Sequence, residues 1–308
     1  MARRSSRSSR IAAILVLALV AVLVTLLVSC PPNRGPSAAN PGAPALPPVR
    51  PQDNRPAPPA IAPAETWGST PPSTPPVGRG STPPERPQLE GRLAIIIDDA
   101  GYSLEELDEF LALPGPLTVS VLPNLPHSRE AAHRILAAGK DLLLHEPMEP
   151  EGGEDPGPGA LRTGQTPQEI AHLLDQAFAS VPAPGMNNHM GSKATADPAV
   201  MFAVMEYLKR DGKFFVDSRT TSDTVGPAEA AAAGVPFLQR NVFIDAGRSK
   251  EEIALAFDRG VSEARQRGAS ILIGHVQDRG VLAILREREG SLSAAGVHLV
   301  HLRELLGQ

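Results

Sequence analysis

LAIIIDDAGY, residues 93–102, is an unbroken apolar run that stops at two adjacent carboxylates and a glycine. Such a run predicts a strand buried on both faces. Adjacent strand residues point to opposite faces, so Asp98 and Asp99 share one site only if the backbone turns there, and Gly101 can supply that turn. Two interpretations are open: one acid holds a metal while its neighbour takes a proton, or both acids cap a helix that begins after Ser103.

Short apolar runs alternate with helical patterns from residue 91 to residue 308, a length that fits a single domain. Helices are expected to begin near Ser128, Thr166, Asp197 and Ser249. This alternation predicts an α/β fold with a mostly parallel sheet, either a barrel or a doubly wound layer. The expected strands are Leu93–Asp98, Leu117–Leu122, Asp141–His145, Gly185–Asn188, Lys213–Asp217, Val242–Asp245, Ser270–Gly274 and Val297–Val300.

Polar side chains follow five of these strands at the same end. They are Asp98-Asp99, His145-Glu146, Asn187-Asn188-His189, Asp217-Ser218-Arg219 and His275. Because the carboxyl ends of parallel strands meet at one edge of a sheet, these residues are expected to form the functional site. The histidines away from that edge are expected to be structural or solvent-facing; they are His127, His133, His172, His298 and His301.

Two classes of function are excluded by the sequence. Residues 145–149 read HEPME and superficially match a helical zinc-protease motif, but Pro147 and Pro150 break a helix there and the second histidine is absent. A net charge of −5 and an aromatic content of 4% argue against nucleic-acid binding.

The amino-terminal residues 1–30 indicate export from the cytoplasm. Arginines within residues 1–10 precede an apolar segment, residues 11–28, which is long enough to span a bilayer. The segment ends in LVSC at residues 27–30, which resembles a bacterial lipoprotein signal in which the cysteine is acylated. Cys30 is the only cysteine, so no internal disulfide forms. Either a lipid or an uncleaved anchor would tether the protein to the membrane on the periplasmic side of the cell envelope.

Residues 31–90 have the composition of a linker. They hold more than half of the chain's 33 prolines, together with Ser, Ala, Gly and Asn, and little apolar material. The composition predicts a disordered, partly polyproline segment that lets the folded domain, residues 91–308, stand off the membrane. Trp67, the single tryptophan, is expected to be exposed in this linker.

From Leu93 to the carboxyl terminus the chain resembles the divergent polysaccharide deacetylase family, a distant branch of the NodB-type carbohydrate esterases. The resemblance implies a distorted β/α barrel of the polysaccharide deacetylase type, with mostly parallel strands and a metal-binding groove. It also implies a polysaccharide or peptidoglycan-like glycan as the partner. The segments that carry it occur in this order: IDD at 97–99, LHEPMEP at 144–150, NNHMGS at 187–192, DSRTT at 217–221 and GH at 274–275.

The resemblance also assigns roles to individual residues. The better-known members use the first acid of an Asp-Asp pair as a base and the second as a metal ligand. They add two histidines four residues apart as ligands, and a late histidine as general acid. By this resemblance Asp98 is the base, Asp99 and His145 are metal ligands, and His275 is the acid.

The chain departs from that pattern at the third ligand. Position 149 holds glutamate instead of a histidine. His189 is expected to replace the missing ligand, with Glu149 as the competing candidate. Two imidazoles and one carboxylate favour zinc among divalent ions. Arg219 is expected to orient the base or to bind substrate, and Asp217 to orient the acid.

The expected function is a metal-dependent hydrolase of the cell envelope that removes N-acetyl or other acyl groups from a polysaccharide. Water would attack the amide carbonyl while Asp98 takes its proton, and His275 would protonate the departing amine. The alternative is a catalytically degenerate module that binds glycan or serves as an envelope scaffold. Such a module has less need for an acid–base pair, which favours the enzyme.

The position of Cys30 generates a prediction about the mature protein. Mass spectrometry of membrane-extracted protein is expected to find an amino terminus at Cys30 that carries acyl chains, because the residues before it resemble a lipoprotein cleavage site. An intact end at Met1 or Ala2 with unmodified Cys30 would indicate an uncleaved anchor instead.

Overall fold

The computed structural model describes residues 90–246 and 249–307. The predictions for the signal, for Cys30 and for the linker except its last residue, Glu90, fall outside these ranges. Within the described ranges, every helix is too short or too polar to cross a bilayer.

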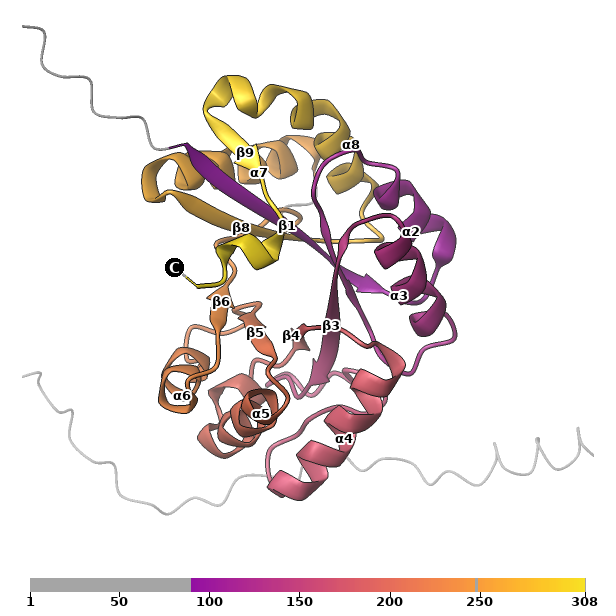
Figure 1. Ribbon diagram of the computed structural model, residues 1–308, viewed down its shortest axis with the longest axis vertical. Coiled ribbons are helices and arrows are strands. Elements are labelled where there is room, and N and C mark those ends of the chain that lie inside the picture. Colours follow the sequence, from indigo (N-terminus) through magenta and orange to yellow (C-terminus); the bar gives the residue numbers. More distant parts are fainter. Residues whose placement is uncertain (1–89, 247–248, 308) are drawn as a thin grey trace, which may run out of the picture. The chain divides into compact units, whose positions relative to one another are not determined.

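The described residues form a parallel sheet of nine strands with helices between them (Figure 1). The sheet order is β6-β5-β4-β3-β2-β1-β8-β7, and β9 pairs with β1. The strands are β1 Gly91–Ala100, β2 Thr118–Val121, β3 Asp141–Met148, β4 Gly185–Met190, β5 Phe214–Asp217, β6 Phe237–Gln239, β7 Val242–Phe243, β8 Ala269–His275 and β9 Val297–Leu299. The helices are α2 Leu104–Leu111, α3 Ser128–Ala137, α4 Pro167–Ser180, α5 Pro198–Arg210, α6 Gly226–Ala233, α7 Lys250–Arg267 and α8 Arg279–Arg288. Short 3-10 turns are η1 Ala194–Ala196, η2 Glu289–Ser291, η3 Ser293–Ala295 and η4 Leu302–Leu305.

The sheet curls because one extended segment contacts both of its ends. β6 pairs with β5, and the next residue, Arg240, donates its backbone N–H to the carbonyl of Asp217 at 2.9 Å. Asn241 then donates its N–H to the carbonyl of Ile271 at 2.8 Å, and β7 continues along β8. The two terminal strands are therefore halves of one stretch of chain. The sheet is a curled half-barrel, which confirms the barrel alternative.

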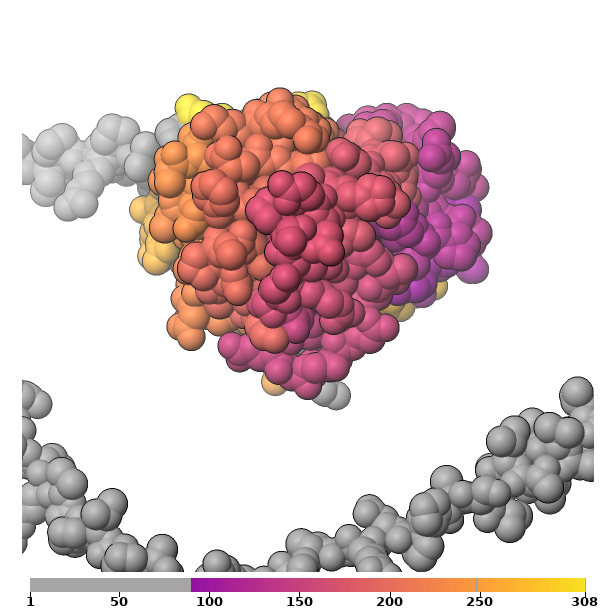
Figure 2. Space-filling model, turned by 90° about the horizontal axis from the view of Figure 1, so that it is seen from below, coloured from indigo at the N-terminus to yellow at the C-terminus, as the bar shows by residue number. Residues whose placement is uncertain are grey.

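The two faces of the curled sheet bury different sets of apolar side chains. On β1, Leu93, Ile95 and Ile97 pack in the large core beneath the helices. The alternate residues Ala94 and Ile96 face the inside of the barrel, in a smaller cluster with residues of η4. Asp98 lies two residues after Ile96, so its side chain points to the same face and enters the barrel at the carboxyl end of β1. Figure 2 shows the outer layer from the side of α4, α5 and α6.

The structure extends and corrects the expected elements. β3 continues three residues beyond its expected end and includes Pro147, which lies beside His189 of β4. The helices expected to begin near Thr166 and Ser249 are present, and each begins with a capping box. Three elements, β6, α6 and α8, were not expected from the sequence. α6 was not recognised because its alanine-rich sequence carries no apolar periodicity.

The close contact between β1 and α7 predicts the effect of a substitution at Gly91. A Cβ at this position would lie 2.8 Å from the backbone carbonyl carbon of Ala264, and backbone cannot move aside as a flexible side chain can. Gly91→Ala is expected to lower the free energy of unfolding by about 1–3 kcal/mol. Gly290→Ala is the matched control, because a Cβ there meets no described atom within 4 Å, and it should stay within about 0.5 kcal/mol. Urea denaturation of both variants tests this; equal stability would contradict it.

Candidate metal and catalytic site

The backbone at the end of β1 turns so that both acids face the same imidazole. Asp99 has a left-handed backbone with φ of 65°, and the register of β1 against β2 shifts between Ile97 and Ala100. The irregularity cancels the normal alternation of side chains. As a result Asp98 Oδ2 lies 3.7 Å and Asp99 Oδ1 lies 3.2 Å from Nε2 of His145.

The alternative role for these acids, as caps of the next helix, is wrong. The N-cap of α2 is Ser103, whose side chain accepts a hydrogen bond from the backbone N–H of Glu106 at 3.4 Å. Gly101 also has a positive φ, 122°, so the turn begins at Asp99 and continues through the glycine. Both carboxylates are therefore free to act in the site.

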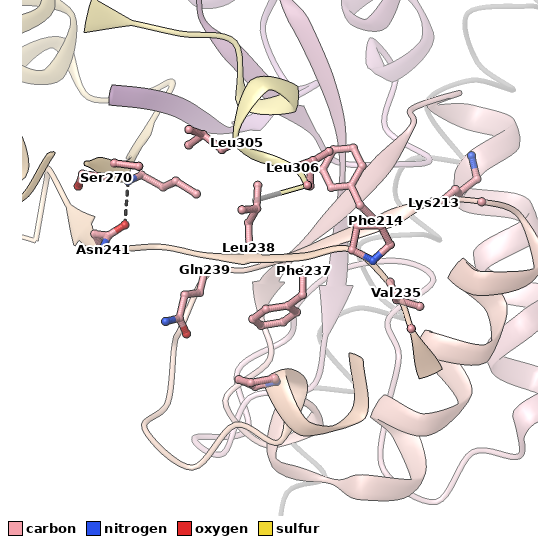
Figure 3. Close-up of a pocket in the computed structure, with 17 residues that line it drawn as sticks. Lys213, Phe214, Val235, Phe237, Leu238, Gln239, Asn241, Ser270, Leu305 and Leu306 are labelled. Atoms are coloured by element: carbon pink, nitrogen blue, oxygen red, sulfur yellow. Dashed lines mark hydrogen bonds between the residues drawn. The ribbon is translucent and has the colours of Figure 1, made fainter. Parts of the chain in front are cut away.

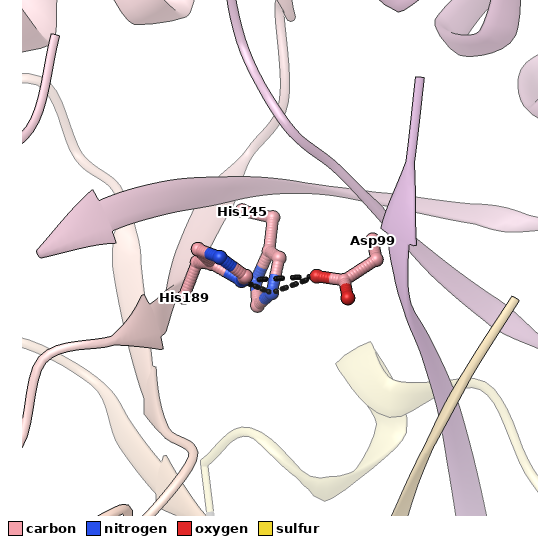
Figure 4. A group of neighbouring side chains, drawn as sticks. All are labelled: Asp99, His145 and His189. Carbon is pink, nitrogen blue, oxygen red and sulfur yellow. Dashed lines mark hydrogen bonds and ion pairs between the residues drawn. The ribbon is translucent and has the colours of Figure 1, made fainter. Parts of the chain in front are cut away.

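Three side chains from three strands converge at this point, as Figure 4 shows. His189 Nδ1 lies 2.9 Å from Asp99 Oδ1 and 3.2 Å from His145 Nε2. One nitrogen or oxygen of each residue lies within 4.8 Å of the other two. The structure thus brings together Asp99 of β1, His145 of β3 and His189 of β4.

The donors of this group fit a divalent metal. Asp99 Oδ1 is buried and, among the described residues, has no hydrogen-bond partner of acceptable geometry, although two imidazole nitrogens lie close to it. Burial alone would raise the pKa of Asp99, but the neighbouring imidazoles of His145 and His189 outweigh this effect and hold that pKa far below the usual range. The carboxylate therefore stays ionised. Two imidazoles and one carboxylate are a ligand set typical of catalytic zinc.

Asp98 lies beside this group and faces His275. The two residues are opposite each other in the pairing of β1 with β8. Asp98 is 2% exposed, and burial raises its pKa in spite of the opposing effect of His145 and His275. The same environment thus raises the pKa of Asp98 and lowers the pKa of its neighbour Asp99. A raised pKa suits a group that must accept a proton.

His275 is held by a residue that the sequence analysis did not assign. Asp245 Oδ2 accepts from the backbone N–H of His275 at 2.8 Å and lies 2.9 Å from its Nδ1. The ring of Phe243 stacks on the imidazole, with 5.9 Å between centroids. Burial would lower the pKa of His275, but Asp245, Asp98 and Asp99 raise it to about 9. The imidazole is therefore protonated at neutral pH.

Asp217 contacts residues other than His275, and Arg219 contacts Gln239 and not Asp98; substrate binding by Arg219 stays a prediction. Asp217 accepts from the backbone N–H of Arg219 and from Thr224 Oγ1, both at 2.7 Å. Arg219 donates from Nη1 to Gln239 Oε1 at 3.0 Å. The expected role of Asp217 toward His275 is filled by Asp245, so Asp217 instead holds the turn after β5.

Glu149, the competing third ligand, faces away from the metal group. Its Oε2 accepts from the backbone N–H and the hydroxyl of Thr163, at 2.8 and 2.7 Å. Its Oε1 accepts from Lys193 Nζ at 2.8 Å, and Lys193 is the first cause of the lowered pKa of Glu149. The carboxylate ties two loops together. Glu149 is therefore not a member of the group that could hold a metal, and His189 is the third member of that group.

Two residues of the site received no role from the sequence, because they act through other side chains. Asn187 contacts both Asp98 and His145, and Asp245 contacts His275. Signals for both were present in the sequence: Asn187 lies in the NNHMGS segment, and Asp245 ends an expected strand as the other site residues do.

The histidines set aside by the sequence analysis lie away from the metal group. His127 is the N-cap of α3, and His133 is an exposed residue of the same helix. The partners of the other three lie away from the carboxyl ends of the strands: Gln176 of α4 for His172, Glu90 before β1 for His298 and Asp141 at the amino end of β3 for His301. Their exclusion from the site agrees with these contacts.

A cavity of about 1000 Å³ lies elsewhere in the molecule (Figure 3). It is lined by residues at the amino ends of β5, β6 and β8 and by the carboxyl-terminal turn, among them Phe214, Leu238, Ser270 and Leu306. The metal and acid–base groups lie at the carboxyl ends of β1, β3, β4 and β8, and they do not line this cavity. The cavity is therefore separate from the candidate site.

Comparison with known proteins assigns the chain to a family. Residues 95–306 match the model of the divergent polysaccharide deacetylases. The match spans nearly all of the described residues, and the protein belongs to this family.

Similar proteins are known from other bacteria. The uncharacterized protein YibQ of Escherichia coli K12 is 38% identical over 190 residues, which are 61% of this chain and 60% of YibQ. An uncharacterized protein of Haemophilus influenzae is 36% identical over 187 residues, which are 60% of this chain and 67% of that protein. The crystal structure of an uncharacterized protein from Agrobacterium tumefaciens C58 shares the fold, with a TM-score of 0.67 and 21% identity over 72% of this chain and 92% of that one.

The Asp245–His275 contact predicts a pH-dependent contribution to stability. The pKa of His275 in the folded protein is about 9, above the value near 6.5 of an unperturbed histidine. The contact therefore stabilises the fold fully below about pH 6.5, and this contribution is lost as the pH rises through about 9. In Asp245→Asn the pKa of His275, followed by NMR in the metal-free protein, should fall. The difference in stability from the native chain should shrink between pH 7 and pH 10; a constant difference would contradict this.

Proposed function

We propose that the protein is a metal-dependent hydrolase that removes N-acetyl groups from a polysaccharide. The observation that carries the proposal is the juxtaposition of two groups of side chains. Asp99, His145 and His189 form a metal-type cluster, and Asp98 and His275 lie beside it as a base and an acid. Membership of the divergent polysaccharide deacetylases supports a carbohydrate amide as the substrate.

Each residue has a distinct task in this hydrolysis. An ion held by the three ligands would act as a Lewis acid that polarises the amide carbonyl and acidifies water. Asp98 takes a proton from the water that forms the new carbon–oxygen bond. His275 gives its proton to the nitrogen as the carbon–nitrogen bond breaks, so that acetate and a free amine leave.

The protonation states of the acid and the base agree with these tasks. His275, with its pKa raised to about 9, carries a proton to donate at neutral pH. Asp98 accepts protons more readily than an ordinary aspartate because burial raises its pKa. Two titratable groups with different roles, placed on neighbouring strands, match the requirement of general acid–base catalysis.

The location of the reaction is part of the proposal. The basic amino terminus, the apolar segment and Cys30 support attachment to the membrane, with the domain on the periplasmic side. The proline-rich composition of residues 31–90 supports a spacer that reaches into the envelope. A peptidoglycan-like glycan is the substrate class available there.

If Asp98 is the base, replacing it should lower the rate of turnover without weakening metal binding. Asp98→Asn keeps the shape of the side chain and removes a base but no ligand, so zinc binding measured by calorimetry should be retained. Release of acetate from an N-acetylated glycan should fall by about 10²–10⁴-fold. Glu149→Gln is the control, because its carboxylate faces Thr163 and Lys193, and it should change neither zinc stoichiometry nor rate.

Three outcomes of this experiment are informative. An unchanged rate in Asp98→Asn would contradict the proposed mechanism. Loss of zinc in Glu149→Gln would contradict the ligand set. If the native protein binds glycan but neither binds zinc nor releases acetate, it is instead the non-catalytic module.

A further inference from the structure

Asn187 is a buried amide at the centre of the site whose hydrogen-bonding capacity is completely used. It lies on β4 beside His145 of β3 and is 0% exposed. Its Nδ2 donates to Asp98 Oδ1 at 2.9 Å and to Ser218 Oγ at 3.2 Å. Its Oδ1 accepts from the hydroxyl of Ser120 and lies 2.8 Å from Nδ1 of His145. An amide has two donor hydrogens and two acceptor lone pairs, so all four are engaged.

The partners of Asn187 determine which way its amide points. An ionised carboxylate only accepts hydrogen bonds, so the atom of Asn187 that faces Asp98 must be the Nδ2 donor. The opposite atom, Oδ1, then faces Nδ1 of His145. Because that oxygen can only accept, Nδ1 must carry a hydrogen.

The hydrogen on Nδ1 has a consequence for the other ring nitrogen of His145. In a neutral imidazole with Nδ1 protonated, Nε2 has a free lone pair. Nε2 is the atom that lies 3.2 Å from both Asp99 Oδ1 and His189 Nδ1. The tautomer that Asn187 requires is therefore the one that presents a ligand atom to the metal group.

We propose that Asn187 is a positioning residue that fixes His145 in its metal-binding tautomer and holds the carboxylate of Asp98 beside it. This inference rests on the proposed function and adds to it a single amide that links the metal ligand to the base. Neutral partners of this kind, placed behind a ligating histidine, set ring orientation and metal affinity.

The next residue provides a matched control. Asn188 is also an asparagine of β4 and is 1% exposed, but its side chain points away from the site. Its Oδ1 accepts from the backbone N–H of Ser218 at 2.8 Å, and its Nδ2 donates to the carbonyl of Met190 at 2.7 Å. Asn188 thus contributes to the fold through backbone contacts and does not contact the base or the ligands.

Two substitutions at Asn187 separate its contact with Asp98 from its contact with His145, and both are made in the full chain. Asn187→Asp keeps an acceptor for His145 Nδ1–H and replaces the donor to Asp98 by a carboxylate oxygen. Asn187→Leu has a similar size and removes both contacts. The matched controls are Asn188→Asp and Asn188→Leu, which should lower the melting temperature without altering His145.

The first measurement is NMR of protein labelled with ¹⁵N in histidine, without metal and with zinc. The native chain should show a slowly exchanging Nδ1–H signal of His145, identified by its absence in His145→Gln. The signal should persist in Asn187→Asp and in both Asn188 variants. It should disappear in Asn187→Leu, where the Nδ1–H has lost its acceptor.

The second measurement is zinc affinity by competition with a chelating dye. Asn187→Leu should bind zinc about 10–100-fold more weakly, while folded Asn188 variants keep the native affinity. Where turnover is measurable, Asn187→Asp should lower kcat by about 10²-fold with KM unchanged, because the base is displaced.

The outcomes separate this inference from the proposed function. A native Nδ1–H signal and native zinc affinity in Asn187→Leu would overturn the inference, as would equal losses in the Asn188 variants. A native protein that binds zinc but releases no acetate would refute the deacetylase. In that case the Nδ1–H signal and the zinc affinity would still decide whether Asn187 positions His145.

Discussion

The left-handed backbone at Asp99 is the constraint on which the site depends. In a regular strand only one of the two acids would enter the barrel, and the other would point toward the helices. The irregularity at the end of β1 places Asp98 and Asp99 on the same side, both near His145 Nε2. Aspartate is one of the few residues that tolerates this conformation, at a cost of about 1 kcal/mol.

The site also depends on the apolar interior beneath it. Ala94 and Ile96 of β1, with Leu302 and Leu305 of η4, fill the inside of the barrel below the acids. Water is excluded from that side, so charge interactions among the polar groups above are stronger than they would be in solvent. The pKa values of the two neighbouring acids therefore differ. The imidazoles near Asp99 keep it ionised, whereas burial raises the affinity of Asp98 for a proton.

The parts of the structure that the sequence predicted are those that depend on local pattern. The apolar run before Asp98 and the capping box at Thr166 identified their elements because periodicity and capping are local. Asn187 and Asp245 were not assigned because their roles depend on which strands lie side by side. The expectation for Asp217 was wrong for the same reason: β7, and not β5, is the neighbour of β8.

The position of Asp245 beside His275 depends on the number of residues in the segment that forms both β6 and β7. The residues between these strands, Arg240 and Asn241, span from one end of the sheet to the other. Inserting or deleting one residue there would shift Asp245 by about 3.3 Å along β8 and turn alternate side chains to the opposite face. His275 would lose its partner although no residue of the site had changed. This segment is therefore expected to tolerate substitutions but not changes in length, whereas surface loops elsewhere tolerate changes in length.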